Sequence, residues 1–294
     1  MTAREPRELE IAVDGGTLHA FSYDGAEPDA PLVLALHGIT GNHLAWAPLH
    51  RRVPGHTILA PDLRGRGLSS ELPGPFGIAR HADDAAAVLA EAGAHRPVVV
   101  VGHSMGAFVA AALAVRHPQL VERLVLVDGG APLPKPPGME RAELSEAARA
   151  ALGPAAERLS ATFPTRDAYL AMFREHPALR DAWDADIEAY AGYDLAGTEP
   201  ELASRTSAEA MLADFAELFV GGAAESIIDR LDRPAVALRA PRGLLDAAPL
   251  YPQGYLDTWA STLPHVTVAE VPDVNHYTIA LGTGAERIAA ELRG

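Results

Sequence analysis

A serine flanked by glycines is the first candidate for chemistry in this sequence. Ser104 is the centre of Gly102-His103-Ser104-Met105-Gly106, which follows the apolar run at 97–101 and precedes a small-residue stretch. Between a strand and a helix, Gly-x-Ser-x-Gly makes a sharp turn that exposes the serine hydroxyl. A serine attacks a carbonyl when a base accepts its proton and donors stabilise the oxyanion. The motif also arises by chance in Gly-rich chains, but this position favours a nucleophile.

A base for Ser104 is expected among the twelve histidines. This motif is associated with the chain order serine, acid, histidine, so the base should lie near the C-terminus. His276 follows a predicted strand at 266–269 and precedes the last predicted helix. We therefore predict His276 as the general base. His103, next to the serine, is expected to shape the pocket.

Two aspartates are candidates for the acid that orients the histidine. Asp246 follows a predicted strand at 235–238, with room for one helix and one strand before His276. Asp128 directly follows a predicted strand at 124–127 and is the alternative. We favour Asp246 as the acid. Asp128 would then hold the start of the following segment by hydrogen bonds.

Two backbone amides are predicted to form the oxyanion hole. Met105 begins the helix after the nucleophile, where N–H groups point toward developing negative charge. Ile39 lies in the glycine-rich loop after the apolar run at 31–36. His37 precedes it, and we expect His37 to hydrogen-bond within the loop; the alternative is a second catalytic base.

The elements that position these residues alternate along the chain. A hairpin is predicted within residues 9–21, followed by strands at 31–36, 56–60, 97–101, 124–127, 235–238 and 266–269 and by helices at 78–92, 107–116 and 284–292. Continuous apolar strands alternating with helices predict an α/β fold, with a mostly parallel sheet covered on both faces.

An insertion interrupts this alternation. Residues 131–138 are proline-rich, and from 139 to about 205 the pattern indicates helices and no convincing strand. We predict a core of residues 1–131 and 206–294 and a helical cap of residues 132–205. Possible pocket-lining residues are His37, Trp46, His103, Phe163, Phe173, Trp183 and Tyr277, although an aromatic residue in a helical cap more often belongs to a core.

Composition limits the partners. The chain has 294 residues, a net charge of −15 and no cysteine, which excludes disulfides and thiolate catalysis. The negative charge disfavours nucleic acids and acidic membranes. No apolar stretch is long enough for a membrane span, and the N-terminus lacks a signal-like apolar segment, so we expect a cytoplasmic protein. We expect a monomer or homodimer with neither a metal nor a cofactor.

In combination these motifs resemble the α/β-hydrolase superfamily, in the group with a helical cap. His37-Gly38, the segment 62–69, Gly102–Gly106 and Asn275-His276 match that group's motifs in order. The resemblance implies an eight-stranded sheet, a Ser-His-Asp triad and a serine esterase, carboxylesterase or lactonase. The insertion is aromatic and apolar, which indicates that the substrate is a hydrophobic small molecule. Serine at 104 departs from the aspartate nucleophile of the epoxide hydrolases and dehalogenases.

Three alternatives remain open at this point. The same triad serves a thioesterase, so the small-molecule substrate is a hydrophobic ester, lactone or thioester. A perhydrolase uses peroxide in place of water. A non-catalytic receptor for a small ligand on this fold is the alternative of another class.

Overall fold

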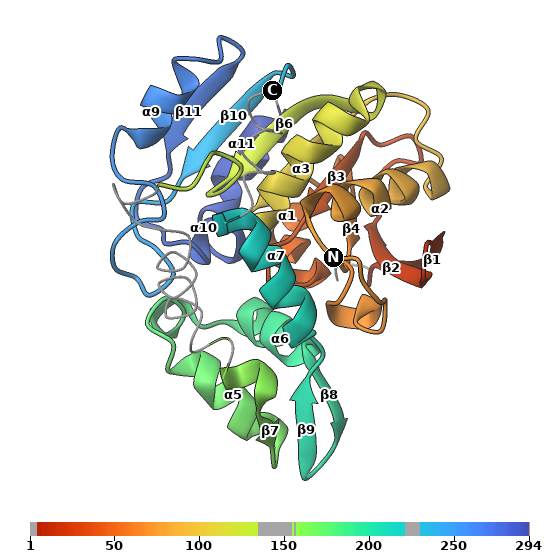
Figure 1. Ribbon diagram of the computed structural model, residues 1–294, viewed down its shortest axis with the longest axis vertical. Helices are drawn as coiled ribbons and strands as arrows, with labels where there is room; N and C mark the ends of the chain where they lie inside the picture. The colour runs from red at the N-terminus through yellow and green to blue at the C-terminus, as the bar shows by residue number, and fades with distance from the viewer. Residues whose placement is uncertain (1–4, 135–154, 156, 221–229, 294) are drawn as a thin grey trace.

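An eight-stranded sheet crosses the molecule in the spatial order β1-β2-β4-β3-β5-β6-β10-β11 (Figure 1). The computed structural model describes residues 5–134, 155, 157–220 and 230–293. The strands are β1 (Arg7–Val13), β2 (Gly16–Tyr23), β3 (Leu32–Leu36), β4 (Thr57–Pro61), β5 (Val98–His103), β6 (Val121–Val127), β10 (Ala235–Arg239) and β11 (Val266–Glu270). β2 pairs antiparallel with β1 and β4, and the other neighbours are parallel. The predicted α/β fold class is confirmed.

Two apolar cores lie on opposite faces of this sheet. Successive side chains of a strand point to opposite sides. Leu34 and Leu36 of β3 therefore pack into one core, whereas Val33 and Ala35 pack into the other. The uninterrupted apolar runs of the sequence thus reflect burial on both faces.

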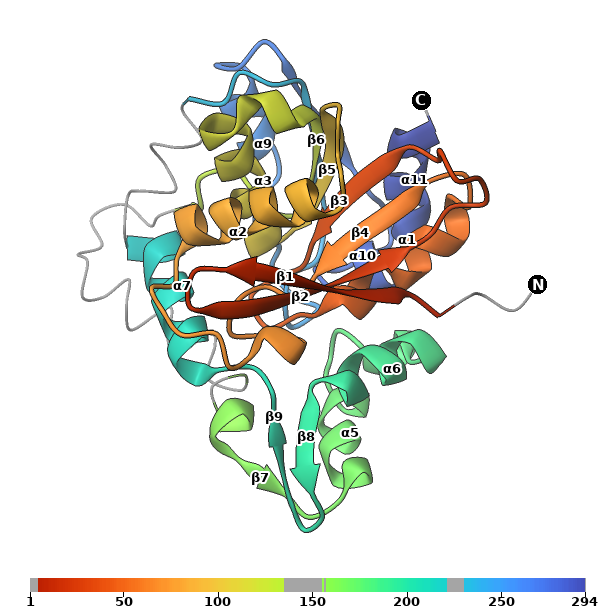
Figure 2. The ribbon, with the colours of Figure 1, turned by 90° about the vertical axis from the view of Figure 1, so that its right-hand side faces the viewer.

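Helices cover both cores (Figure 2). The helices are α1 (Ala47–Arg52), α2 (Ile78–Glu91), α3 (Met105–Arg116), α9 (Tyr255–Ala260), α10 (Thr278–Leu281) and α11 (Ala285–Arg293), with short 3-10 turns η1 (His43–Trp46), η2 (Gly67–Ser69) and η3 (Pro118–Leu120). Residues of α2, α3 and α9 belong to one core, and residues of α1, α10 and α11 belong to the other. Within the described ranges, none of the helices combines the length and apolarity needed to cross a membrane.

The segment between β6 and β10 contains strands that the sequence did not predict. Its described elements are β7 (Thr162–Phe163), α5 (Arg166–Arg174), η4 (Arg180–Ala182), α6 (Ala185–Tyr193), β8 (Leu195–Thr198), β9 (Glu201–Ser204) and α7 (Ala208–Val220). β7, β9 and β8 form a three-stranded antiparallel sheet. The expectation of helices alone is wrong, because strands of two to four residues carry too little periodicity and form only through pairing. Residues 135–154 of the predicted cap lie outside the described residues.

Several hydrogen bonds join this segment to the main domain, and three of them reach from its middle part to loops of the main sheet. The Tyr193 hydroxyl donates to Asp62 Oδ2 at 2.7 Å, and Asn42 Nδ2 donates to the Tyr190 carbonyl at 3.0 Å. Asn275 Nδ2 donates to the Ala178 carbonyl at 2.9 Å. Figure 1 shows α5, α6 and the small sheet beyond one end of the main sheet. The segment therefore stands over the loops that carry the candidate site.

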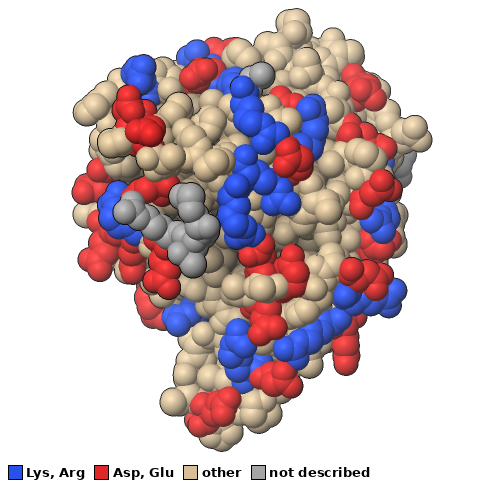
Figure 3. Space-filling model, turned by 180° about the vertical axis from the view of Figure 1, so that it is seen from behind, with Lys and Arg blue, Asp and Glu red and all other residues tan. Residues whose placement is uncertain are grey.

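Charges of both signs are mixed on the surface. On the face in Figure 3, basic side chains form a band bordered by acidic ones. The net charge of the chain is −15. The prediction that nucleic acid is not a partner remains a prediction.

Candidate active site

The candidate nucleophile occupies a strained turn between β5 and α3. Ser104 has φ 54° and ψ −121°, a conformation with positive φ that non-glycine residues rarely adopt. Its N–H donates to the Val127 carbonyl of β6 at 2.9 Å. A Cβ atom at Gly106 would lie 2.1 Å from the Leu36 carbonyl oxygen. One at Gly129 would lie 2.3 Å from the Ser104 carbonyl oxygen. Glycine at these positions therefore lets the turn pack between β3 and β6.

The candidate base is held by a buried carboxylate. His276 is 4% exposed and lies in the loop between β11 and α10. Its Nδ1 lies 2.7 Å from Oδ2 of Asp128, which is fully buried. Asp128 Oδ1 accepts from the Ala240 N–H at 3.1 Å, and the Asp128 N–H donates to the Leu238 carbonyl at 2.7 Å. These bonds hold the carboxylate in place and leave Nε2 as the ring nitrogen that Asp128 does not engage.

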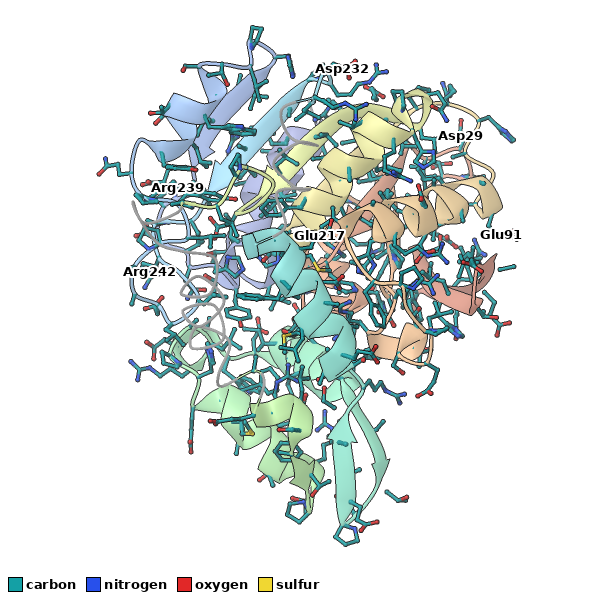
Figure 4. The ribbon with its side chains drawn as sticks, viewed as in Figure 1. Asp29, Glu91, Glu217, Asp232, Arg239 and Arg242 are labelled. Carbon is teal, nitrogen blue, oxygen red and sulfur yellow. The ribbon has the colours of Figure 1, made fainter. Side chains whose placement is uncertain are left out.

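The expectation that Asp246 pairs with His276 is wrong. Asp246 instead accepts from the Arg242 guanidinium and from the Asn275 amide, each at 2.9 Å. Figure 4 labels Arg242, which lies in the loop after β10 together with Asp246. β6 is the sheet neighbour of β5, and Asp128 directly follows β6. Asp128, at the end of the adjacent strand, therefore reaches the ring of His276, whereas the Asp246 side chain reaches Asn275, the residue before it.

The loop after β3 holds the peptide group predicted to bind an oxyanion. The Gly38 carbonyl, in the same peptide as the Ile39 N–H, accepts from His37 Nδ1 at 2.8 Å. It also accepts from the Gly41 N–H at 2.9 Å. Two donors on the carbonyl orient the Ile39 N–H of that peptide. We therefore retain Ile39 as one predicted donor and Met105, at the start of α3, as the other.

His37 makes the hydrogen bonds within the loop that the sequence predicted. Its Nε2 accepts from the Leu63 N–H at 2.9 Å, so the neutral ring carries its hydrogen on Nδ1 and donates it to Gly38. Burial lowers the pKa of His37 to about 3. Both ring nitrogens are occupied, so the alternative of a second catalytic base is not supported.

The His103 side chain forms a hydrogen bond with the backbone of the candidate base, His276. Its Nε2 donates to the His276 carbonyl oxygen at 2.7 Å, and the two rings lie 4.8 Å apart between centroids. Burial, followed by the neighbouring His276, lowers the pKa of His103 to about 3. His103 is therefore neutral near pH 7 and cannot add a positive charge beside the base.

The site residues line one cavity of about 810 Å³, part of it open to solvent. Ser104, His276, Ile39 and Met105 contribute to its wall. The apolar part of the wall comes from α3 (Phe108), the loop after β6 (Leu133), α7 (Phe215 and Leu218) and the loop after β10 (Leu244 and Leu250). An apolar wall of this kind accommodates an apolar group of a substrate next to the nucleophile.

A second cavity of about 690 Å³ adjoins the first and shares Thr40, Tyr190 and Tyr277 with it. It is lined by residues of the insertion together with Thr40, Asn42 and Tyr277 of the main domain. In its wall Arg158 and Asp194 form a buried ion pair. The space beside the nucleophile therefore leads toward the insertion.

Only some of the predicted pocket residues line these cavities. His103 and Tyr277 line the first cavity, and Phe173 and Tyr277 line the second. Four predicted residues line neither: His37, Trp46, Phe163 and Trp183. Trp46 is fully buried in a core, Phe163 packs edge to face on Tyr169, and Trp183 packs beneath the Arg174 guanidinium. These aromatic residues stabilise the fold, the ordinary role of such side chains.

Sequence reasoning missed the contribution of α7. Met211, Phe215 and Leu218 are spaced as one face of a helix, which was the available signal. Phe215 and Leu218 line the cavity, and Met211 packs with Phe215 against Ile39. The sequence places this segment in the predicted core of residues 206–294 and indicates no role for it at the site.

One group with metal-ligand geometry occurs among the described residues, and it lies away from the cavity. Glu8, Glu10 and His19 of the β1–β2 hairpin place ligand atoms within 4.8 Å of one another. His19 Nδ1 already lies 2.7 Å from Glu8 Oε1, and the group is largely exposed. None of these three residues lines the cavity of Ser104.

Comparisons with known proteins address the family and the fold. Over 111 residues the chain is 40% identical to lipase LipV of Mycobacterium tuberculosis, covering 38% of this chain and 41% of that protein. Over 99 residues it is 36% identical to 2-(acetamidomethylene)succinate hydrolase of Mesorhizobium japonicum, covering 33% and 35%. An uncharacterized protein of Mycobacterium tuberculosis is 35% identical over 126 residues, covering 42% and 36%. The chain thus spans less than half the length of each of these relatives.

Solved structures match over nearly the whole chain. A thioesterase domain from the curacin biosynthetic pathway superposes with a TM-score of 0.78 at 20% identity, covering 99% of this chain and all of that one. An E-2-(acetamidomethylene)succinate hydrolase superposes with a TM-score of 0.77 at 23% identity, covering 98% and 100%. At these identities the likeness establishes the fold alone. A sequence model described as the alpha/beta hydrolase fold matches residues 31–283, and the chain therefore belongs to this family of hydrolases.

Proposed function

We propose that this protein is a serine hydrolase that cleaves a carboxylic ester or lactone of a hydrophobic small molecule. The observation that carries the proposal is the contact between Asp128 and His276, 2.7 Å long, on a base that lines the same cavity as Ser104. A nucleophile and a base in the wall of one cavity, with an acid bonded to the base, form the set that acyl transfer requires.

The reaction begins with attack by Ser104 Oγ on the substrate carbonyl. His276 Nε2 accepts the hydroxyl proton, because Asp128 engages Nδ1 and stabilises the positive ring. The N–H groups of Ile39 and Met105 stabilise the oxyanion. His276 then returns the proton to the leaving alcohol, which leaves an acyl group on Ser104. Water activated by His276 releases the acid and restores the serine.

The apolar wall of the cavity favours a hydrophobic substrate. Phe108, Leu133 and Phe215 surround the space next to the nucleophile. Burying an apolar group there contributes about 25 cal/mol for each Å² removed from water. A charged group in the same space would lose hydration without a partner, which disfavours it.

The test is steady-state turnover of a panel of p-nitrophenyl esters, lactones and acyl thioesters. We expect many turnovers with apolar esters or lactones and none above background for Ser104→Ala. Labelling with a fluorophosphonate should modify the wild type and not Ser104→Ala. Ser261→Ala, which removes an exposed serine, is the matched control and should be labelled like the wild type.

Other outcomes would replace the proposal. Turnover restricted to thioesters would make the protein a thioesterase. Turnover of esters that accelerates with peroxide and yields peracid would make it a perhydrolase. A single slow turnover with tight retention of the ligand would indicate a receptor. Wild-type rates in Ser104→Ala would rule out the nucleophile itself.

A further inference from the structure

A buried arginine holds the loop that carries the predicted oxyanion donor. Arg66 is fully buried, and its Nε donates to the Ile39 carbonyl oxygen at 2.9 Å. Its Nη1 donates to the Arg64 carbonyl oxygen at 2.8 Å. The preceding carbonyl, that of Gly38, accepts from His37 and Gly41. Two consecutive carbonyls of this loop, those of Gly38 and Ile39, therefore each have a donor, and Arg66 is the donor to Ile39.

Arg66 is itself anchored by a residue of α7. Asp214 is fully buried, and its Oδ2 lies 2.5 Å from Arg66 Nη1. Asp214 also accepts from the Gly77 N–H at 2.7 Å and pairs with His81 Nε2 at 2.9 Å. Burial raises the pKa of Asp214, but His81 and Arg66 outweigh it and hold that pKa below its usual value. The carboxylate therefore stays ionised and keeps the guanidinium in place.

α7 contacts the same loop through a second, apolar route. The side chain of Ile39 packs against Met211 and Phe215 of α7. Glu217, labelled on α7 in Figure 4, accepts from the Ile78 N–H at the start of α2 at 2.9 Å. α7 therefore contacts the main domain both before Asp214, through Met211, and after it, through Phe215 and Glu217.

We propose that Arg66 is a positioning residue for the oxyanion hole, held in place by Asp214. The inference rests on the proposed function, since it concerns the same site. Loss of the Arg66 Nε donor leaves the partly buried Ile39 carbonyl without this hydrogen bond, and the loop shifts to recover one. A displacement of an oxyanion donor of about 1 Å lowers the rate of the chemical step much more than it weakens substrate binding.

The test compares two buried arginine–aspartate pairs. Arg66→Lys keeps the charge facing Asp214 but loses the donor to Ile39, and Asp214→Asn removes the anchor. Arg64→Lys is the matched control, because the Arg64 side chain is fully buried and bonds Asp84 through Nε at 2.9 Å and Nη2 at 3.0 Å. The readouts are kcat and KM for an apolar ester, inhibition by a trifluoromethyl ketone, and amide hydrogen exchange of residues 37–42.

In Arg66→Lys and Asp214→Asn we expect kcat to fall about 10- to 100-fold while KM stays within about twofold. Inhibition by the ketone, whose adduct carries an oxyanion, should weaken by the same factor. Exchange at 37–42 should accelerate at least about tenfold. In Arg64→Lys all three readouts should stay within about twofold of the wild type, whatever the loss of stability.

The positioning role is overturned if exchange at 37–42 is unchanged in both variants of the Arg66 pair, or if Arg64→Lys alters it equally. If Arg66→Lys does not fold, Asp214→Asn decides, because the arginine donor is then still present but unanchored. A wild type that hydrolyses no ester refutes the proposed function, and the exchange measurement still decides the role of Arg66.

Discussion

Oδ2 of Asp128 lies 2.7 Å from Nδ1 of His276, although the two residues are 148 positions apart in the chain. Asp128 follows β6, which lies between β5 and β10 in the sheet. The strand order therefore brings the acid beside the turn that carries Ser104. The buried carboxylate is placed to stabilise His276 when that ring takes up a proton.

Asp128→Asn should lower kcat for an ester substrate by about 10³- to 10⁴-fold, because an amide neither stabilises the protonated ring nor enforces the required tautomer. Asp246→Asn is the matched control and should lower kcat by less than about fivefold, since the Asp246 side chain bonds Arg242 and Asn275. Steady-state kinetics on variants shown to be folded by circular dichroism measure both. The reverse order of effects would return the role to Asp246.

Gly106→Ala should destabilise the protein by about 3 kcal/mol or more, because its Cβ would lie 2.1 Å from the Leu36 carbonyl oxygen. Helix propensity alone predicts the opposite sign, since alanine favours α3 by about 1 kcal/mol over glycine. Gly55→Ala is the control, with nothing within 4 Å of the added Cβ and an expected change within about 0.5 kcal/mol. Urea denaturation measures both free energies of unfolding, and equal values would contradict the packing argument.

His103→Gln should make the protein less sensitive to acid. Burial holds the pKa of folded His103 at about 3, against 6.5 for an ordinary histidine. Between these values the unfolded chain binds more protons, so stability falls as the pH drops below 6.5. Each such histidine contributes a slope of about 1.4 kcal/mol per pH unit in this window. The free energy of unfolding of the variant, measured from pH 6 to pH 4, should show a slope smaller by that amount; identical slopes would refute the pKa shift.

Leu250→Trp should narrow the specificity for the acyl group. Leu250 lines the cavity from the loop after β10 and is only partly buried, so a larger ring at this position can fill space in the cavity of the nucleophile. For p-nitrophenyl octanoate we expect kcat/KM to fall at least about tenfold, and for the acetate to stay within about twofold. A uniform loss across chain lengths would mean that the acyl group occupies another part of the cavity.

The alternating pattern of the main sheet and the position of Ser104 were readable from the chain. Strands such as β3 are buried on both faces and appear as continuous apolar runs, and Gly102–Gly106 links one of them directly to a helix. Both signals are local, because they depend on neighbours within a few residues. His276 was predictable for a related reason, since its place after the last strand follows from the order of elements.

Three features depended on contacts that no local pattern encodes: which aspartate pairs with His276, the wall of the pocket, and the small antiparallel sheet. Asp128 and Asp246 both follow strands, and only the spatial order of β5, β6 and β10 separates them. Arg66 reaches Ile39 because α7, far along the chain, supplies Asp214 to hold it. Pairing between distant segments has no periodicity along the chain, so these features appear only once the chain is folded.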